Sequence, residues 1–314
     1  MAGSTPASPT ADAVIAPSPA RSRRASLGHE AWRRFRRHRL ALASAGVLLT
    51  LLVALCLGPL IWPMPINAID FAAHLRGPSL GHPLGTDDLG QDLLARMIHG
   101  GRISMAVGVA AMLVAVIVGV FVGAVAGTAR GSVDLALMWL CDVFLSLPQL
   151  PVLLLIIYLF QDSLRKLVGQ EIGTFVLIVA VIGGFRWMSI ARLVRAQFFS
   201  LREKEFVEAA RALGASILRQ VVRHILPNAV GPVIVAGTIE VAYAIILEST
   251  LSFLGLGFPP DVPSWGRILY DAKDYLDVAP HWALFAGGAI FLAVMTINFI
   301  GDGLRDALDP RRVI

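Results

Sequence analysis

Charge is scarce in this chain, and cysteine and lysine are scarcer. Only 16% of the 314 residues are Asp, Glu, Lys or Arg, whereas 56% are hydrophobic and the mean hydropathy is +0.70. Soluble domains rarely combine so little charge with so many apolar side chains. The two cysteines, Cys56 and Cys141, lie inside apolar segments without metal-binding or redox neighbours. The composition therefore implies no disulfide framework and predicts a membrane protein.

Motifs for nucleotide hydrolysis and metal binding are also missing. None of the lysines follows a glycine, so the sequence has no phosphate-binding loop that ends in Gly-Lys-Ser or Gly-Lys-Thr. The seven histidines show no HExxH or paired spacing, and no basic–aromatic stripe indicates nucleic acid. We therefore expect no catalytic residue, no metal site and no bound cofactor on this chain, and no nucleic-acid partner.

What the sequence does contain is a series of apolar segments. A helix needs about 20 apolar residues to cross a bilayer. Six segments approach or exceed that length, at residues 40–62, 103–127, 134–160, 172–190, 229–253 and 282–300. Most of the 27 lysines and arginines flank them on one side, which predicts a multi-pass, all-α membrane protein with six transmembrane helices and both termini in the cytosol. Arg186, in the fourth and weakest segment, is expected to snorkel toward the cytosolic headgroups.

This interpretation divides the chain into five parts. Residues 1–39 form a cytosolic tail that is largely disordered and then basic, and residues 40–62 form the first transmembrane helix. Residues 63–102 form an extracytoplasmic loop with a short helix capped by Thr86. Residues 103–306 form the core transmembrane domain with a cytosolic loop at about 200–227, and residues 307–314 return to the cytosol.

Small residues and prolines mark two of the predicted spans. Gly119, Gly123 and Gly127 recur at four-residue spacing, which lets a second helix approach closely, either from the same chain or from another subunit. Pro148 and Pro151 interrupt the third span and predict a kink. Such a kink suits both a translocation path and ordinary helix packing.

Three carboxylates lie well inside the predicted spans. Asp142 lies in the third span, and Glu240 and Glu248 lie in the fifth. Ionisable side chains at membrane depth are costly and usually face a bundle interior or a cavity, where they have partners. They are candidates for lining or gating a path, and the alternative is a hydrogen-bonded structural role.

The loop near residue 208 is the most informative part of the sequence. Residues 203–213 predict an amphipathic helix with Phe206, Ala209, Ala210 and Leu213 on its apolar face. Gly214 is expected to end this helix in a left-handed conformation. A second amphipathic turn is predicted to follow, with Ile217, Leu218, Val221, Val222 and Ile225 facing inward, and to end at Pro227. The unit suits docking to a cytosolic partner, although a helix that only covers the membrane ends would look similar.

The same loop carries a family resemblance. Glu208-Ala209-Ala210, Gly214 and Leu226-Pro227 resemble the "EAA" signature of permease subunits of ATP-binding-cassette (ABC) importers. Further segments resemble the C-type permeases of dipeptide, oligopeptide and nickel importers, at residues 82–92, 252–257, 263–266 and 301–311. Two positions depart from that pattern, because Gln91 and Trp139 stand where many members have arginine.

The resemblance implies a type I ABC importer (MetI-like) permease fold and a place in the bacterial inner membrane. Glu208, Ala209, Ala210, Gly214, Leu226 and Pro227 would couple the chain to its ATPase. The implied partners are a second homologous permease, two ATPase subunits that hold ATP and Mg²⁺, and an extracytoplasmic substrate-binding protein. The expected function is to form half of the pathway for peptides or similar small solutes. An ion-driven secondary transporter and a non-transporting membrane scaffold are the alternatives.

The two long outer loops are the expected meeting place for that binding protein. The first contains Asp87 and Asp92, and the second contains Pro263 and Trp265. Both loops are predicted to pack over the outer mouth, with Asp87, Asp92 and Trp265 as candidate contacts. The competing interpretation is that these residues only hold the loops together.

Overall fold

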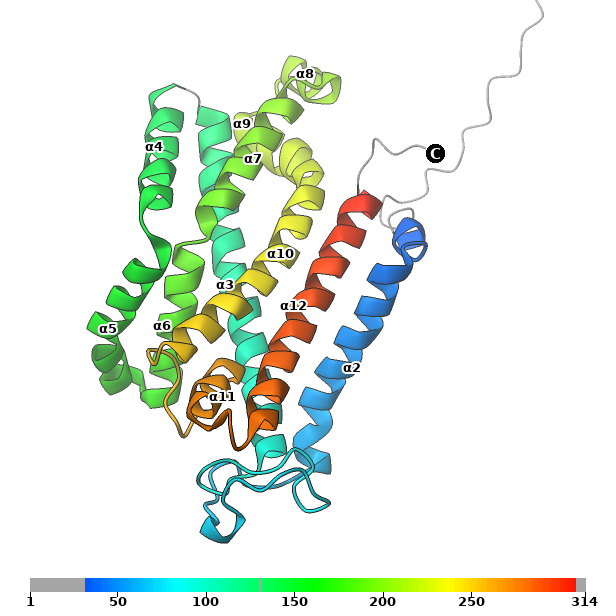
Figure 1. The fold of residues 1–314 in the computed structure, drawn as a ribbon. Helices are drawn as coiled ribbons and strands as arrows, with labels where there is room; N and C mark the ends of the chain where they lie inside the picture. The colour runs from blue at the N-terminus through cyan, green and yellow to red at the C-terminus, as the bar shows by residue number, and fades with distance from the viewer. Residues whose placement is uncertain (1–31, 130, 309–314) are drawn as a thin grey trace, which may run out of the picture.

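The computed structural model describes residues 32–129 and 131–308, so most of the predicted N-terminal tail and the last six residues lie outside it. Every named element of these residues is a helix, and an isolated bridge joins Thr86 to Asp92. The helices run roughly along one direction and form a bundle with two distinct ends (Figure 1). The short helix α8 (Glu205–Ala212) lies at one end, and the loop of residues 62–92 lies at the other.

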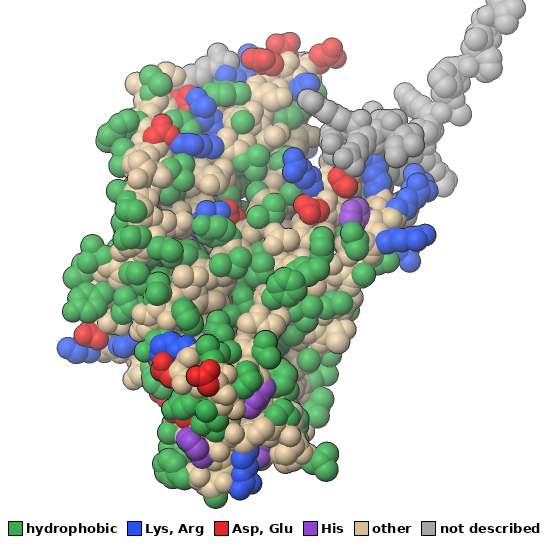
Figure 2. All heavy atoms as spheres, in the orientation of Figure 1, with side chains coloured by type: hydrophobic (Ala, Val, Ile, Leu, Met, Phe, Trp, Pro, Cys, Tyr) green, Lys and Arg blue, Asp and Glu red, His purple; other side chains and the backbone are tan. Residues whose placement is uncertain are grey.

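Four helices are long and apolar enough to cross a membrane without interruption. They are α2 (Arg39–Ile61), α3 (Leu93–Ala129), the helical run Ile217–Phe253 and α12 (Pro280–Leu308). Figure 2 shows their surface covered mainly by hydrophobic side chains along the middle of the bundle, with most charged side chains near the ends. This pattern is that of a protein whose middle contacts lipid.

The third and fourth predicted spans are each broken into two helices. The third consists of α4 (Ser132–Ser146) and α5 (Gln149–Val168), which meet at an angle of 87°. The fourth consists of α6 (Gln170–Gly184) and α7 (Trp187–Arg202), which meet at 41°. If each bent pair is one span, the described residues have six spans, as the sequence predicts. The first break falls at Pro148, whose ring prevents continuous helical hydrogen bonding.

The glycine stripe of α3 packs against α7 of the same chain. A Cβ atom added at Gly123 would lie 2.5 Å from the carbonyl oxygen of Ala191, and one added at Gly127 would lie 2.5 Å from the Cβ of Phe198. The two helices therefore approach more closely than any larger residue would permit. Of the two partners left open by the sequence, this structure supports the intramolecular one.

The end of the bundle opposite α8, which the sequence predicts to be extracytoplasmic and which we call the outer end, is closed by shorter elements. A 3₁₀ turn (Phe71–Ala73), α11 (Trp265–Ala272) and a second 3₁₀ turn (Lys273–Tyr275) lie between the long helices. The expectation of a short separate helix capped by Thr86 is wrong. Residues up to Gln91 form turns, and α3 begins at Leu93, where the Asp92 carboxylate accepts a hydrogen bond of 2.7 Å from the Ala95 amide. Asp92 is thus the cap, and the helix continues directly into the second span.

We expect Gly123→Val to destabilise the bundle, because its side chain would collide with the backbone of α7 rather than with a movable side chain. The cost should be about 1–3 kcal/mol or more, measured as a lower midpoint of thermal unfolding in detergent. Gly46→Val is the matched control, because a Cβ at Gly46 meets no atom within 4 Å. Equal loss in both variants would contradict this packing.

Candidate functional site

The loop between α7 and α10 (Leu226–Phe253) is built as two short helices joined by a turn. Helix α8 begins after Lys204 and ends at Ala212, and α9 (Ile217–Gln220) begins after Ser216. The Ser216 hydroxyl accepts a hydrogen bond from the Arg219 amide and so caps α9. The loop stands at the end of the bundle opposite the 62–92 loop (Figure 1).

The apolar face of α8 differs from the predicted one. Val207 and Ala210 are the buried side chains of this helix, whereas Phe206, Ala209 and Leu213 are exposed. Spacing of three residues places Val207 and Ala210 on the same face, toward the bundle. The sequence pattern alone could not separate the two faces, because apolar residues occur on both.

The second turn departs from its prediction in the same way. Ile225 is buried and Val221 is half-buried, as expected, but Ile217, Leu218 and Val222 are exposed. Together with Leu213, which is 89% exposed, these side chains form what we call the docking surface: Phe206, Leu213, Ile217, Leu218 and Val222. Charged residues such as Glu208 and Arg219 alternate with them, so the segment cannot lie in the bilayer core. Apolar side chains clustered in water indicate a surface that a partner covers.

Gly214 gives the loop its shape. Its φ is +79°, and no atom lies within 4 Å of a Cβ placed there. The position therefore needs glycine for its backbone conformation and not for space. The amide of Ala215 donates to the Ala210 carbonyl across this turn, which closes the end of α8.

Pro227 does not end the second helix, contrary to the sequence prediction. The chain runs from Ile217 to Phe253 without a break, because a π-helical turn at Val221–Ile225 precedes the proline. Within that turn the Leu226 amide donates to the Val221 carbonyl, five residues back. A π turn of this kind accommodates a missing amide donor and often marks a functional position. The docking loop is therefore rigidly continuous with α10.

A polar cluster occupies the middle of the bundle. The Arg186 guanidinium donates to both carboxylate oxygens of Glu240, at 2.7 and 2.8 Å, and lies 3.7 Å from the centre of the Tyr243 ring. The Tyr243 hydroxyl donates to the side-chain oxygen of Gln149 at 3.2 Å. The expectation that Arg186 snorkels to the headgroups is thus wrong, because a carboxylate at the same depth holds it in a bidentate pair.

The position of this cluster is informative. Gln149 is the first residue of α5 and Arg186 precedes α7, so the breaks in both bent spans meet α10 here. The amide nitrogen of Gln149 is buried and has no hydrogen-bond partner among the described residues. Broken helices and polar groups at membrane depth are typical of substrate pathways. Glu240 was among the predicted pathway residues, but Gln149, Arg186 and Tyr243 were not.

Two further ion pairs join α4 to α7. Arg195 donates to both oxygens of Asp134, at 2.5 and 2.6 Å, and Arg192 pairs with Asp142. Asp142 and Arg192 are both exposed on the single chain, although Asp142 lies about 15 Å along α4 from its start at Ser132. Trp139, on the same helix, is also exposed. An exposed ion pair at that depth would be costly in lipid, so this face of α4 calls for a protein or an aqueous neighbour.

Glu248 sits in a different environment from the other two carboxylates. Its side chain is fully buried and accepts hydrogen bonds from Ser104 at 3.0 Å and from Ser252 at 2.8 Å. The Ser104 hydroxyl also accepts from the Trp265 amide at 3.2 Å, so this cluster ties α3, α10 and α11 together. The enclosure favours the structural role for Glu248 over a place on a pathway wall.

The outer candidates are buried as well. Asp87, Asp92 and Trp265 are each less than 5% exposed, so the structure corrects the expectation that these side chains touch a partner directly. Asp92 accepts from Trp62 at 3.0 Å and pairs with His82 at 2.8 Å, and the Trp265 indole donates to the Met97 carbonyl at 3.1 Å. Their work is to hold the loops together.

A buried charge network completes the outer end. Arg96 lies 3.6 Å from Asp87 and 3.8 Å from Asp271, and it donates to the side-chain oxygen of Gln91. Burial raises the pKa of the Asp87 and Asp271 carboxyls above their ordinary range, and the neighbouring arginines act in the opposite direction. Gln91, which departs from the family pattern, therefore takes part in the network by accepting a hydrogen bond.

In residues 32–129 and 131–308, no group of three His, Cys, Asp or Glu side chains could hold a metal ion. The arrangement instead combines a water-exposed docking surface, a polar cluster at membrane depth and an outer end fixed by buried charges. Such parts are suited to transmitting movement through a membrane.

Comparisons with known proteins show which proteins this chain resembles. Residues 119–314 match the family described as binding-protein-dependent transport system inner membrane component. Residues 26–78 match the N-terminal transmembrane domain of oligopeptide transport permease C. The chain is 44% identical to the Escherichia coli K12 oligopeptide transport system permease protein OppC over 91% of this chain and 92% of that protein. It is 40% identical to the glutathione transport system permease protein GsiD of Shigella flexneri over 90% of each chain.

We expect the Arg186–Glu240 pair to be needed for stability. Glu240→Ala or Arg186→Ala alone leaves one buried charge without its partner and should cost about 3–5 kcal/mol. The double variant should recover much of this loss, and thermal unfolding in lipid nanodiscs measures all three. Lys273→Ala, which breaks an exposed surface pair with Asp274, should change little. Additive losses in the double variant would contradict direct pairing.

Proposed function

The chain belongs to the family of binding-protein-dependent transport system inner membrane components, and on this premise we propose that it is a permease subunit of an ABC importer. It has the MetI-like fold of that family and forms half of a transmembrane pathway. The similarity to OppC and GsiD makes peptides or similar small solutes the proposed cargo. The protein is a transport subunit and not an enzyme.

One observation carries this proposal. The docking surface places Leu213 and Leu218 in water, at 89% and 73% exposure, on a short rigid helical unit. Both ends of that unit continue directly into spans, through α7 on one side and α10 on the other. A partner that binds this surface can therefore move two helices at once. The partner we propose is an ATPase subunit, which would hold the ATP and Mg²⁺ that this chain has no motif to bind.

The proposed orientation puts the docking surface in the cytosol. The described chain begins and ends near this same end of the bundle (Figure 1), where the basic residues of the 202–223 loop also lie. Both termini would then be cytosolic, in the inner membrane. The opposite end, closed by the 62–92 loop and α11, would face an extracytoplasmic binding protein.

A second permease completes the proposed pathway. The face of α4 that exposes Asp142 and Trp139, with Arg192 of α7 paired to Asp142, is the proposed side toward that subunit or toward the aqueous path between the two. The unpartnered amide of Gln149 suits a polar solute such as a peptide, whose carbonyl oxygens accept hydrogen bonds. ATP binding would favour one arrangement of the paired permeases through its differential affinity, and hydrolysis would reset it.

The alternatives differ from an importer in what drives uptake. An ion-driven transporter or a membrane scaffold needs no nucleotide, so uptake in reconstituted vesicles separates them from an importer. Uptake that depends on ATP and on co-purified ATPase subunits supports the proposal. Uptake driven by an ion gradient alone, or no uptake by a complete complex, rejects it.

We expect Leu213→Asp to weaken association with the ATPase subunits about 10- to 100-fold. The partner would bury the exposed Leu213 side chain, which contributes roughly 1.5–3 kcal/mol, and the substitution puts a charge in its place. Membrane insertion should be unchanged, since Leu213 is not packed within the chain. Leu80→Asp is the matched control, because Leu80 is a fully exposed leucine at the opposite end. Co-purification measures the association, and equal retention of ATPase by both variants would reject docking at α8.

Gly214 offers an independent test through the backbone. Gly214→Val should reduce ATP-coupled uptake, since a β-branched residue at a φ of +79° costs roughly 1–2 kcal/mol or more and reorients α8. Gly214→Asn should retain more activity, because asparagine tolerates the left-handed region. No atom crowds the position, so the two variants should differ only through their backbone preferences. Similar losses in both variants would show that the turn conformation is not what matters.

A further inference from the structure

A basic turn precedes the first span at the end of the bundle that carries the docking surface, which we call the docking end. Residues 32–35 form one helical turn, and α2 begins at Arg39, where the His38 ring accepts a hydrogen bond of 3.1 Å from the Ala41 amide. Four arginines are exposed here, and we call them the basic patch: Arg33, Arg36, Arg37 and Arg39. Figure 2 shows Lys and Arg side chains gathered where α2 begins in Figure 1.

Buried contacts fasten this turn to the bundle. The Phe35 side chain is buried, and it packs with Ala41 of α2 and with Ala307 in the last turn of α12. A Cβ atom added at Gly303 of α12 would overlap Ala41 and lie 3.2 Å from the Phe35 ring, so the three segments are in close contact. The basic patch is therefore held at the level where α2 begins and α12 ends.

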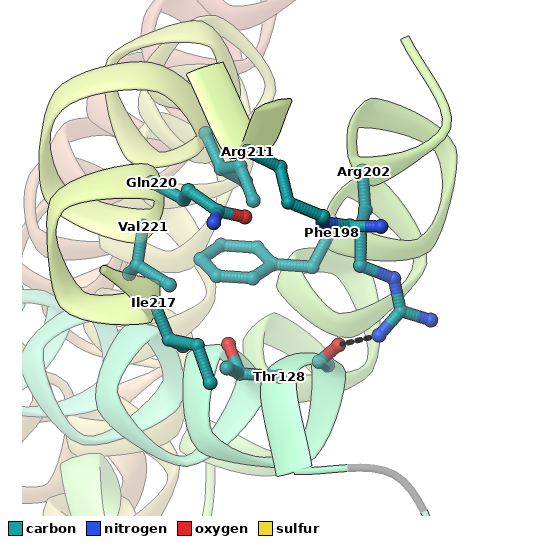
Figure 3. Close-up of a pocket in the computed structure, with 9 residues that line it drawn as sticks. Thr128, Phe198, Arg202, Arg211, Ile217, Gln220 and Val221 are labelled. Carbon is teal, nitrogen blue, oxygen red and sulfur yellow. Dashed lines mark hydrogen bonds between the residues drawn. The ribbon is translucent and has the colours of Figure 1, made fainter. Parts of the chain in front are cut away.

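No carboxylate among the described residues neutralises the basic patch. None of its four arginines forms an ion pair or a side-chain hydrogen bond with another described residue. Arginines elsewhere at this end do have partners. Arg192 and Arg195 pair with aspartates, and Arg202, beside a cavity of about 410 Å³ behind α8 and α9, donates to the Gly127 carbonyl (Figure 3). Four neighbouring positive charges without a counter-charge favour an anionic surface beside them.

Trp32 indicates what kind of surface this is. Its ring stacks on Phe35 with the ring centres 6.1 Å apart, and the Arg36 guanidinium lies 5.9 Å from its centre. More than half of the Trp32 side chain, 55%, is nevertheless exposed. Tryptophan is enriched where lipid meets water, because its ring is apolar and its N–H is polar. An exposed tryptophan among arginines, directly before a span, suits a layer of lipid headgroups.

We propose that the basic patch binds the headgroups of anionic phospholipids in the leaflet at the docking end. Guanidinium groups are suited to bidentate contacts with phosphate oxygens. Clusters of four or more basic residues directly beside a span attract anionic lipids through the surface charge of the membrane. The proposal requires only that α2 crosses the bilayer, for which it is long and apolar enough. It does not depend on the proposed transport.

The test uses the full-length chain purified in detergent. Short-chain phosphatidylglycerol, short-chain phosphatidylcholine and inorganic phosphate are titrated separately, and bound molecules are counted by native mass spectrometry. Phosphatidylglycerol should bind more tightly than the other two. Arg36→Gln should weaken its binding about fivefold. Glutamine at all four positions of the basic patch should abolish the preference for phosphatidylglycerol, whereas lysine at all four keeps the charge and should retain most of it.

The matched control removes the same charge from the docking loop at the same end of the bundle. It replaces four exposed basic residues in combination: Lys204→Gln, Arg211→Gln, Arg219→Gln and Arg223→Gln. This variant should keep its preference for phosphatidylglycerol, because the basic patch is intact. Thermal unfolding of each variant without lipid shows whether it is folded. If the fourfold glutamine variant does not fold, Arg36→Gln and the lysine variant decide the test.

Each of four results would overturn the proposal. Equal affinity for phosphatidylglycerol and phosphatidylcholine would mean that the headgroup charge is not recognised. Phosphate that binds as tightly as phosphatidylglycerol would make this a site for free anions. Unchanged lipid binding in the variants of the basic patch would place the lipid elsewhere, and an equal loss in the docking-loop variant would reduce the effect to net charge. Because binding is measured without transport, failure of solute import would contradict only the proposed function.

Discussion

The arrangement of this protein depends on the pairing of arginines on one helix with carboxylates on its neighbours. Helix α7 carries Arg192 and Arg195, which pair with Asp142 and Asp134 of α4, and Arg186 at its start pairs with Glu240 of α10. An unpaired charge at membrane depth is far more costly than one in water, so a shift of one helix that separated such a pair would be strongly unfavourable. The glycine stripe of α3 holds the remaining side of α7 at close range.

This pairing couples the docking loop to the middle of the bundle. The loop joins α7 through a short turn at residues 203–204 and continues as helix into α10, and the Arg186–Glu240 pair joins the same two spans deep in the bundle. The two spans are therefore joined at two levels, by the docking loop at one end of the bundle and by the ion pair in its middle. The breaks near Gln149 and Arg186 are the natural hinges, because backbone hydrogen bonding is already interrupted there. Movement of the docking loop would therefore be transmitted through α7 and α10 to the polar cluster.

The sequence predicted what depends on local pattern and missed what depends on contact. Hydrophobic length gave the six spans, and spacing gave the EAA loop and its turn at Gly214, because each is set by a few neighbouring residues. The partners of Arg186, Asp134 and Asp142 could not be predicted, since they come from helices separated by 50 residues or more. The burial of Asp87 and Asp92 could not be predicted for a different reason, because it depends on how the outer loop folds back on itself and brings Arg96 to Asp87, and His82 and Trp62 to Asp92. The apolar face of α8 was misassigned because both of its faces carry apolar side chains, and only the position of the bundle distinguishes them.

The two ends of the bundle are held in opposite ways, and this difference indicates which end moves. At the outer end, Arg96 with its acidic partners and Glu248 with its serines join α3, α10 and α11 through buried polar contacts, which break only at high cost. At the docking end, the contacts between α8 and the bundle rest mainly on Val207 and Ala210, and large apolar side chains remain in water. An end that gains contacts on binding a partner, and has few internal contacts to lose, can change position at low cost. An end closed by buried charges would have to break those contacts in order to move. Force applied to the docking loop should therefore rotate α7 and the adjoining first part of α10 about the polar cluster, while the outer end of the bundle stays in place.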